Sequence, residues 1–249
     1  MASIERAVAN FVDRLEPRSL DGIRGQDELV TTLRELVRTS QVREHPLPPL
    51  LLIGSDDSQT QGIAAAVARE FLGDREDSIV EVEADTIDSR SELARQLLSL
   101  KANDVLIVHD VDTLDPTLYR QLLTATREFC LEVSNIEEEL GAMTPVSLPF
   151  FSLIATTAEE ISVDVIQDWL TARVQPYEAE ALVEVAKWSG LRLGVTITDE
   201  AAEELALRCE GRPRELNALV ASIYLEYAEE LGRDEKWLID AEMVRRRLE

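Results

Sequence analysis

The chain has 249 residues, of which 45% are hydrophobic, enough to build one large domain and a smaller second one. Its 49 acidic and 25 basic residues give a formal net charge of −24, and residues 51–170 alone contribute −17. Because such a surface repels nucleic-acid phosphates and anionic membranes, we expect neither as a partner. Two roles stay open for the charge, namely solubility and the docking of a basic protein.

The cysteines and the N-terminus carry no metal or targeting signal. Cys130 and Cys209 lack the spacing of metal ligands, and two cysteines do not make a disulfide framework. Residues 1–13 mix charged and apolar side chains, unlike a signal peptide, and no apolar run approaches the length of a membrane span. We therefore predict a cytoplasmic protein.

The sequence pattern of residues 1–175 predicts alternating helices and strands. A first helix is expected at 3–16, ended by Pro17, and a second at about 27–40. Short, continuous apolar runs indicate buried parallel strands at 50–54, 80–82, 105–108 and 150–155. The segments that follow the first three strands predict helices at 61–72, 89–100 and 116–133. This alternation is typical of a three-layer α/β sandwich with a parallel sheet.

The strand pattern stops at about residue 176. Helical periodicity then predicts four helices, at 177–189, 199–209, 213–231 and 241–248. Thr198 is a suitable N-cap for the second of them. We therefore place a large α/β domain at residues 1–175 and a small all-α domain at residues 176–249.

The segment after the first strand has the outline of a phosphate-binding loop without its chemistry. The pattern G-x-x-x-x-G-K-[ST] needs a second Gly, a Lys and a hydroxyl group to hold phosphates and Mg²⁺. Counted from Gly54, these three positions hold Gln59, Thr60 and Gln61. Asp56 and Asp57 in the same loop would repel a triphosphate. A plain strand–turn–helix is the structural alternative.

The strand at 105–108 leads into His109 and Asp110, where an ATPase needs Asp for Mg²⁺ and Glu for the attacking water. Histidine is a poor ligand for this hard cation, and Asp110 has a shorter side chain than Glu. A shifted register with Asp110 as metal ligand stays open. His109 with Asp110 and Asp112 could form a transition-metal site, but without a second nitrogen or sulfur ligand a core or loop histidine is the preferred interpretation.

Four fragments, in order, resemble the RuvB family, the bacterial Holliday-junction branch-migration motors of the AAA+ class. They are residues 16–21 with Gly25-Gln26, residues 104–108 with Leu114, residues 148–157, and the Gly-Arg-Pro-Arg of residues 211–214. The resemblance covers roughly residues 15–231. It implies a P-loop-type three-layer sandwich with a parallel sheet, followed by a small all-α lid domain.

The resemblance also implies a nucleotide pocket, of which four positions are kept. Gly54 ends the first strand, Thr156 (or the adjacent Thr157) corresponds to sensor 1, Tyr177 lies near the base, and Arg214 corresponds to sensor 2 at the γ-phosphate. We favour structural roles for these residues. Tyr177 then packs at a helix start, the Thr pair caps a strand end, and Arg214 pairs with an acid such as Glu215 or Glu210.

Other family positions are lost. Glu16 replaces an Arg that helps to hold the adenine end, Arg24 replaces an Ile, and the arginine-finger stretch at 166–170 contains no Arg, so that Arg173 is the nearest candidate. The family continues into a winged-helix DNA-binding domain that would begin near Glu249. We assign no catalytic or metal-binding residue and expect no cofactor, because ATP and Mg²⁺ fit only a rearranged pocket.

The sequence therefore predicts a non-catalytic pseudo-ATPase that acts as a protein-binding scaffold or as a regulatory or assembly subunit. Its partner would be an active AAA+ subunit or a basic protein. The alternative is a weakly active or nucleotide-binding AAA+ ATPase linked to DNA recombination or repair, in which Asp110 and Arg173 supply the missing chemistry.

Overall fold

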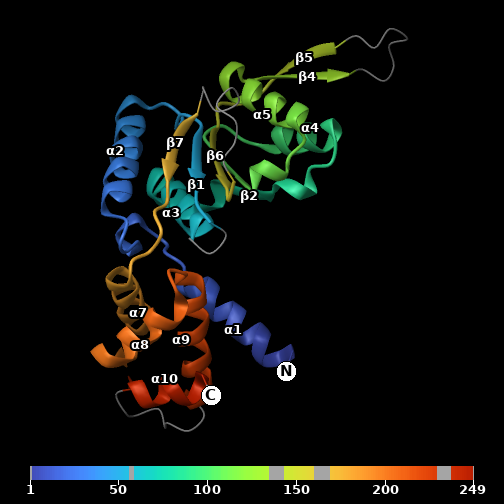
Figure 1. Cartoon of the computed structure of the whole chain (residues 1–249). Coiled ribbons are helices and arrows are strands. Elements are labelled where there is room, and N and C mark those ends of the chain that lie inside the picture. The colour runs from blue at the N-terminus through green and yellow to red at the C-terminus, as the bar shows by residue number, and fades with distance from the viewer. Residues whose placement is uncertain (1, 56–58, 135–142, 160–168, 229–236, 249) are drawn as a thin grey trace.

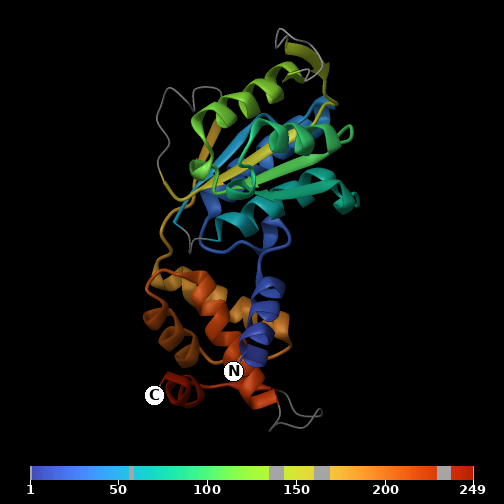
Figure 2. The ribbon, with the colours of Figure 1, turned by 90° about the vertical axis from the view of Figure 1, so that its right-hand side faces the viewer.

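The protein consists of an α/β part and a helical part stacked end to end (Figure 1). The computed structural model describes residues 2–55, 59–134, 143–159, 169–228 and 237–248. Figure 2, turned by 90°, shows the same two parts joined near α1 and the segment that leads into α7. The predicted fold class, a P-loop-type α/β sandwich followed by a small all-α part, is confirmed.

A parallel sheet forms the centre of the α/β part. Its strands follow the order β2-β3-β6-β1-β7, and each neighbouring pair is parallel. Their bounds are β1 (Leu50–Ile53), β2 (Ile79–Glu83), β3 (Val105–His109), β6 (Ser152–Thr157) and β7 (Leu170–Arg173). The four strands expected from apolar runs are confirmed within two residues at their ends. β7 was missed, because this edge strand is exposed at three of its four positions and has no continuous apolar run.

Helices cover both faces of the sheet, which explains why β1 is apolar throughout. Leu50 and Leu52 belong to a cluster with α2 (Asp27–Arg43) and α3 (Thr60–Leu72). Leu51 and Ile53 belong to a second cluster with α4 (Arg90–Ser99) and α5 (Pro116–Glu128). Successive side chains of a strand point to opposite faces, so a strand buried on both faces has no polar position.

The helix predicted at 116–133 was wrong at its C-terminal end. α5 ends at Glu128, and Phe129 adopts a left-handed conformation with φ 48°. The chain then forms an antiparallel hairpin of β4 (Cys130–Ser134) and β5 (Met143–Ser147). Leu131 is buried and continues the apolar spacing of α5, so periodicity alone extended the helix across the turn.

The described residues of the C-terminal part form the helices α7 (Ala179–Leu193), α8 (Asp199–Cys209), α9 (Pro213–Ala228) and α10 (Ala241–Leu248). The Thr198 hydroxyl accepts a hydrogen bond from the Ala201 N–H at 3.1 Å, which confirms its capping role. Two short strands, β8 (Thr196–Ile197) and β9 (Leu238–Ile239), pair here in parallel and were not predicted. Single 3-10 turns lie at Leu20–Gly22, Glu76–Ser78, Ala84–Thr86 and Val111–Thr113.

The N-terminal helix α1 (Ala2–Leu15) packs on the helical part, although the sequence placed it in the first domain. It runs along α9 in both views (Figures 1 and 2), and the rings of Phe11 and Tyr224 lie 5.4 Å apart. The domain boundary at 175/176 stays a prediction. No helix among the described residues is long and apolar enough to cross a membrane.

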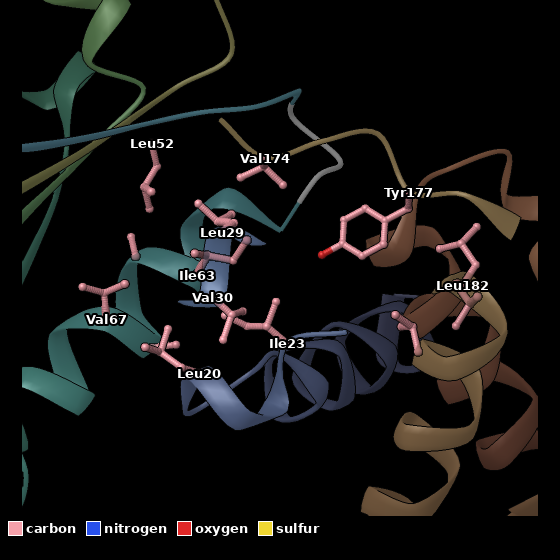
Figure 3. Packing of buried hydrophobic residues seen from close by; sticks show 14 of the residues in the cluster. Leu20, Ile23, Leu29, Val30, Leu52, Ile63, Val67, Val174, Tyr177 and Leu182 are labelled. Atoms are coloured by element: carbon pink, nitrogen blue, oxygen red, sulfur yellow. The ribbon is translucent and has the colours of Figure 1, made fainter. Parts of the chain in front are cut away.

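One hydrophobic cluster continues from the sheet into the helical part (Figure 3). Tyr177 and Leu182 lie on the helical side of this cluster and face Ile23 and Leu29 on the other side. At this junction the backbone comes very close to α7. Gly25 has φ +70°, and a Cβ atom added there would lie 2.3 Å from the Cβ of Ala181.

Gly25→Ala is therefore expected to lower the free energy of unfolding by about 2 to 4 kcal/mol, through left-handed strain plus overpacking against Ala181. Gly194→Ala is the matched control, because Gly194 has φ +77° but nothing within 4 Å of an added Cβ. That variant should lose only about 1 to 2 kcal/mol. Urea unfolding measures both, and equal losses would contradict a close contact at the junction.

Candidate functional site

A cleft of about 200 Å³ lies beyond the carboxyl ends of the central strands and reaches the start of α9. This is the usual place for a ligand site in a parallel α/β sheet. Its described lining residues come from five segments of the chain: Glu16, Gly54, Ser55, Gln59, Thr60, Gln61, Asp110, Thr156, Thr157, Ala158 and Arg214. The structure therefore gathers three of the four predicted pocket residues, namely Gly54, Thr156 and Arg214.

The position of the second Gly of the phosphate-loop motif has a backbone conformation that favours glycine, although another residue occupies it. Gln59 precedes α3 with φ 60° and ψ 23°, the left-handed conformation that favours glycine. The motif has its second Gly at this position. Gly54 donates its N–H to the Thr157 carbonyl at 3.0 Å, so the strand ladder extends to the loop. Asp56 and Asp57 lie outside the described residues.

The charge in the cleft is opposite to what a triphosphate needs. Arg214 is the one cationic side chain among the described lining residues, and its Nε lies 4.0 Å from Glu16 Oε1. Asp110 adds a second carboxylate. The predicted partners of Arg214 were wrong, because Glu215 pairs with Arg212 at 2.6 Å and Glu16 takes its place.

The two threonines at the end of β6 bind protein groups. Thr156 Oγ1 accepts a hydrogen bond from the Asp110 N–H at 3.2 Å. Thr157 Oγ1 donates to Asp112 Oδ1 at 2.7 Å and accepts from the Glu159 N–H at 3.1 Å. Asp110 itself has φ 52°, and its turn is fixed by the contact with Thr156. These bonds favour a structural role for the Thr pair.

His109 lies at the end of β3 and is 4% exposed. Its Nε2 is 3.3 Å from Glu81 Oε2, and its Nδ1 is 3.5 Å from Thr156 Oγ1. The hydrogen bond with His109 lowers the pKa of the Glu81 carboxyl. The His109 ring thus has protein neighbours at both nitrogens, and no metal-ligand cluster occurs in the described part of the chain.

Tyr177 does not line the cleft. It is 5% exposed and sits in the core between the two parts, with its hydroxyl directed toward α2 (Figure 3). Burial raises the pKa of Tyr177, and the neighbouring Gln26 side chain partly offsets the rise. The hydroxyl makes no hydrogen bond of normal geometry with the described residues. Its position supports a packing role.

Arg173, the candidate for a displaced arginine finger, is also apart from the cleft. It belongs to β7 and lines a separate groove with Gly25 and the first turn of α2. Gln167 and Asp168, in the stretch where the finger was expected, lie outside the described residues. Sequence reasoning counted Glu16 only as a lost Arg, and it missed that this carboxylate would face Arg214 across the cleft.

The residues at the phosphate-loop positions differ from those that hold Mg²⁺–ATP in the motif. Gln61 puts an amide where the loop needs a hydroxyl ligand, and Thr60 replaces the Lys that reaches the phosphates.

Comparison with known proteins identifies the family of the α/β part. Residues 15–174 match the family model described as the Holliday junction DNA helicase RuvB P-loop domain. The structure of the Thermotoga maritima RuvB Holliday junction branch migration motor is similar, with a TM-score of 0.76, 21% identity, and coverage of 94% of this chain and 72% of that chain. Two variants of the same T. maritima protein match with TM-scores of 0.78 and 0.77 at 20% and 22% identity and the same coverage.

Gln59→Gly should leave the free energy of unfolding unchanged or raise it by up to about 1 kcal/mol, because relief of left-handed strain offsets the added chain entropy. Gln61→Gly is the same chemical change inside α3 and should cost about 0.5 to 1 kcal/mol. Thermal and urea unfolding of both variants provide the measurement. A clear loss on Gln59→Gly would show that Gln59 holds the loop through its side chain.

Proposed function

The chain belongs to the RuvB family of AAA+ P-loop proteins, which is linked to Holliday junction branch migration, and we propose that it is a non-catalytic member. In this proposal it is a pseudo-ATPase that serves as a protein-binding scaffold or as a regulatory or assembly subunit. The observation that carries the proposal is the cleft, in which, among the described lining residues, the carboxylates of Glu16 and Asp110 outnumber the one cation, Arg214.

The physical argument concerns the charge that develops during phosphoryl transfer. Catalysis depends on a Lys, a metal ion and an arginine finger that stabilise the negative oxygens, and the finger alone is worth about 10³ to 10⁵ in rate. The cleft offers Arg214, whose guanidinium already lies beside Glu16. A nucleotide would have to displace that carboxylate and to place its phosphates near Asp110, so both binding and turnover are disfavoured.

The active alternative, a weak ATPase, has less support. It needs Asp110 as a metal ligand and Arg173 as a displaced finger. These two residues line different hollows, Asp110 the cleft and Arg173 the groove between β7 and α2. Arg173 could therefore act as a finger only in trans, at the cleft of a second copy.

We expect no calorimetric heat of binding with micromolar Mg²⁺–ATP and no phosphate release above background. Asp110→Ala is the matched control, because turnover that persists in this variant comes from a contaminating ATPase. Micromolar affinity together with turnover that disappears in Asp110→Ala would establish the alternative.

We also propose that the partner is a protein, either an active AAA+ subunit or a basic protein, and that DNA is not the partner. The support is the formal charge of −24, because binding to DNA requires Lys and Arg to neutralise phosphates. A mobility-shift assay with a synthetic four-way junction should show no complex at about 50 mM salt, where electrostatic binding is strong. A complex that weakens steeply toward about 200 mM salt would overturn this part of the proposal.

A further inference from the structure

β7 is an edge strand of the central sheet. β7 is the last strand in the order β2-β3-β6-β1-β7, and β1 is its only partner among the described strands. The N–H groups of Leu170 and Val174 each donate to carbonyls of the β1 segment at 2.8 Å. Alternate residues of a parallel strand address opposite neighbours, so the backbone groups of Thr171 and Arg173 face away from β1.

The chain itself already pairs with this edge at one point. Gln175 is the next residue that faces outward after Arg173. Its N–H donates to Gln26 Oε1 at 3.0 Å, and its carbonyl accepts from Gln26 Nε2 at 2.8 Å. The buried Gln26 amide thus makes the two hydrogen bonds that the backbone of a neighbouring strand would make at Gln175. No described strand continues this pairing toward Thr171.

A groove of about 490 Å³ lies along this edge, between β7 and the first turns of α2. Leu29 and Ala172 give it an apolar floor, because both are buried core residues that also line the groove. A peptide that adds to a sheet edge gains affinity from main-chain hydrogen bonds and specificity from pockets for alternate side chains. The groove places the outward side of β7 beside a pocket with an apolar floor.

The charge of the groove selects the side chains of a bound strand. Asp27 and Glu28 are exposed in the first turn of α2, line the groove, and form no ion pair with the described residues. Ala172 belongs to the cluster on the α2 face of the sheet, so strand alternation places the Arg173 side chain on the opposite face. In a strand bound at this edge, every second side chain therefore lies on the α2 face and meets the carboxylates of Asp27 and Glu28.

We propose that the β7 edge and this groove form a docking site for an extended protein segment with Lys or Arg at alternate positions. The basic side chains face Asp27 and Glu28, and the residues between them lie on the opposite face of the sheet. The inference rests on the proposed function, since it gives the protein partner a chemical class and a place to bind.

The probe is a blocked, fluorescent seven-residue peptide of alternating Lys and Thr, titrated into the full chain at several salt concentrations. We expect saturable binding, slowed exchange of the Thr171 amide hydrogen, and at least about tenfold weaker binding of the matching Glu–Thr peptide. A strand presents the N–H groups of alternate residues to each edge. Two further Lys–Thr peptides test this pattern, one methylated on the backbone nitrogen of every Lys and the other on the backbone nitrogen of every Thr. Binding should be abolished in only one of these two methylated peptides.

Thr171→Pro removes the outward N–H and leaves the β1 bonds of its neighbours, and proline is tolerated on an edge strand when its N–H would face away from the sheet. It should weaken the Lys–Thr peptide at least about tenfold, whereas Thr171→Val should not. Should Thr171→Pro fail to fold by circular dichroism, the double variant Asp27→Asn/Glu28→Gln takes its place. Glu35→Gln, an exposed carboxylate on the same helix, is its control.

Three results would overturn the inference. The first is unchanged peptide binding by a folded Thr171→Pro variant, and the second is an equal loss of binding with both methylated peptides. The third is a dimer of the chain that dissociates on Thr171→Pro, which would make a second copy of this chain the occupant. Failure of peptide binding would leave the pseudo-ATPase proposal standing, and ATP turnover would overturn that proposal without affecting the peptide result.

Discussion

A single hydrophobic cluster joins the sheet to the helical part, and the meeting of Arg214 with the strand ends at the cleft depends on it. Leu52 and Ile63 belong to its sheet side, Leu182 to its helical side, and Tyr177 lies between them (Figure 3). Burial of apolar surface stabilises by roughly 25 cal/mol per Å² and needs no ligand. The two parts are therefore held together by packing.

Packing of this kind preserves the shape of a site and leaves its chemistry free to change. Gln59 keeps a left-handed backbone although it has lost the Gly that makes this conformation easy. Thr156 and Asp110 keep their positions at the strand ends because they bind each other. The side chains that would touch phosphate are the ones that differ, and Glu16 now faces Arg214 across the cleft. The same junction places Gln26 against the β7 edge, where its side-chain amide pairs with the backbone of Gln175.

Apolar runs and short motifs predicted most of the fold and three residues of the cleft. Runs such as residues 105–108 are reliable because only a strand covered on both faces is apolar throughout. The prediction failed where two structures share one spacing, as at Leu131, and where packing leaves few apolar positions, as in β7. Tyr177 was placed near a base by resemblance, whereas its burial puts it in the core.

The sequence by itself determined the family, the alternation of strands and helices, and the loss of the Lys and Gly of the phosphate loop, because these are local patterns. Only the tertiary structure decided which groups meet across the junction. Glu16 reaches Arg214, and Gln26 binds the backbone of Gln175 from 149 positions away. Such contacts depend on how whole elements pack, and packing is driven by nondirectional burial that leaves no spacing rule in the chain.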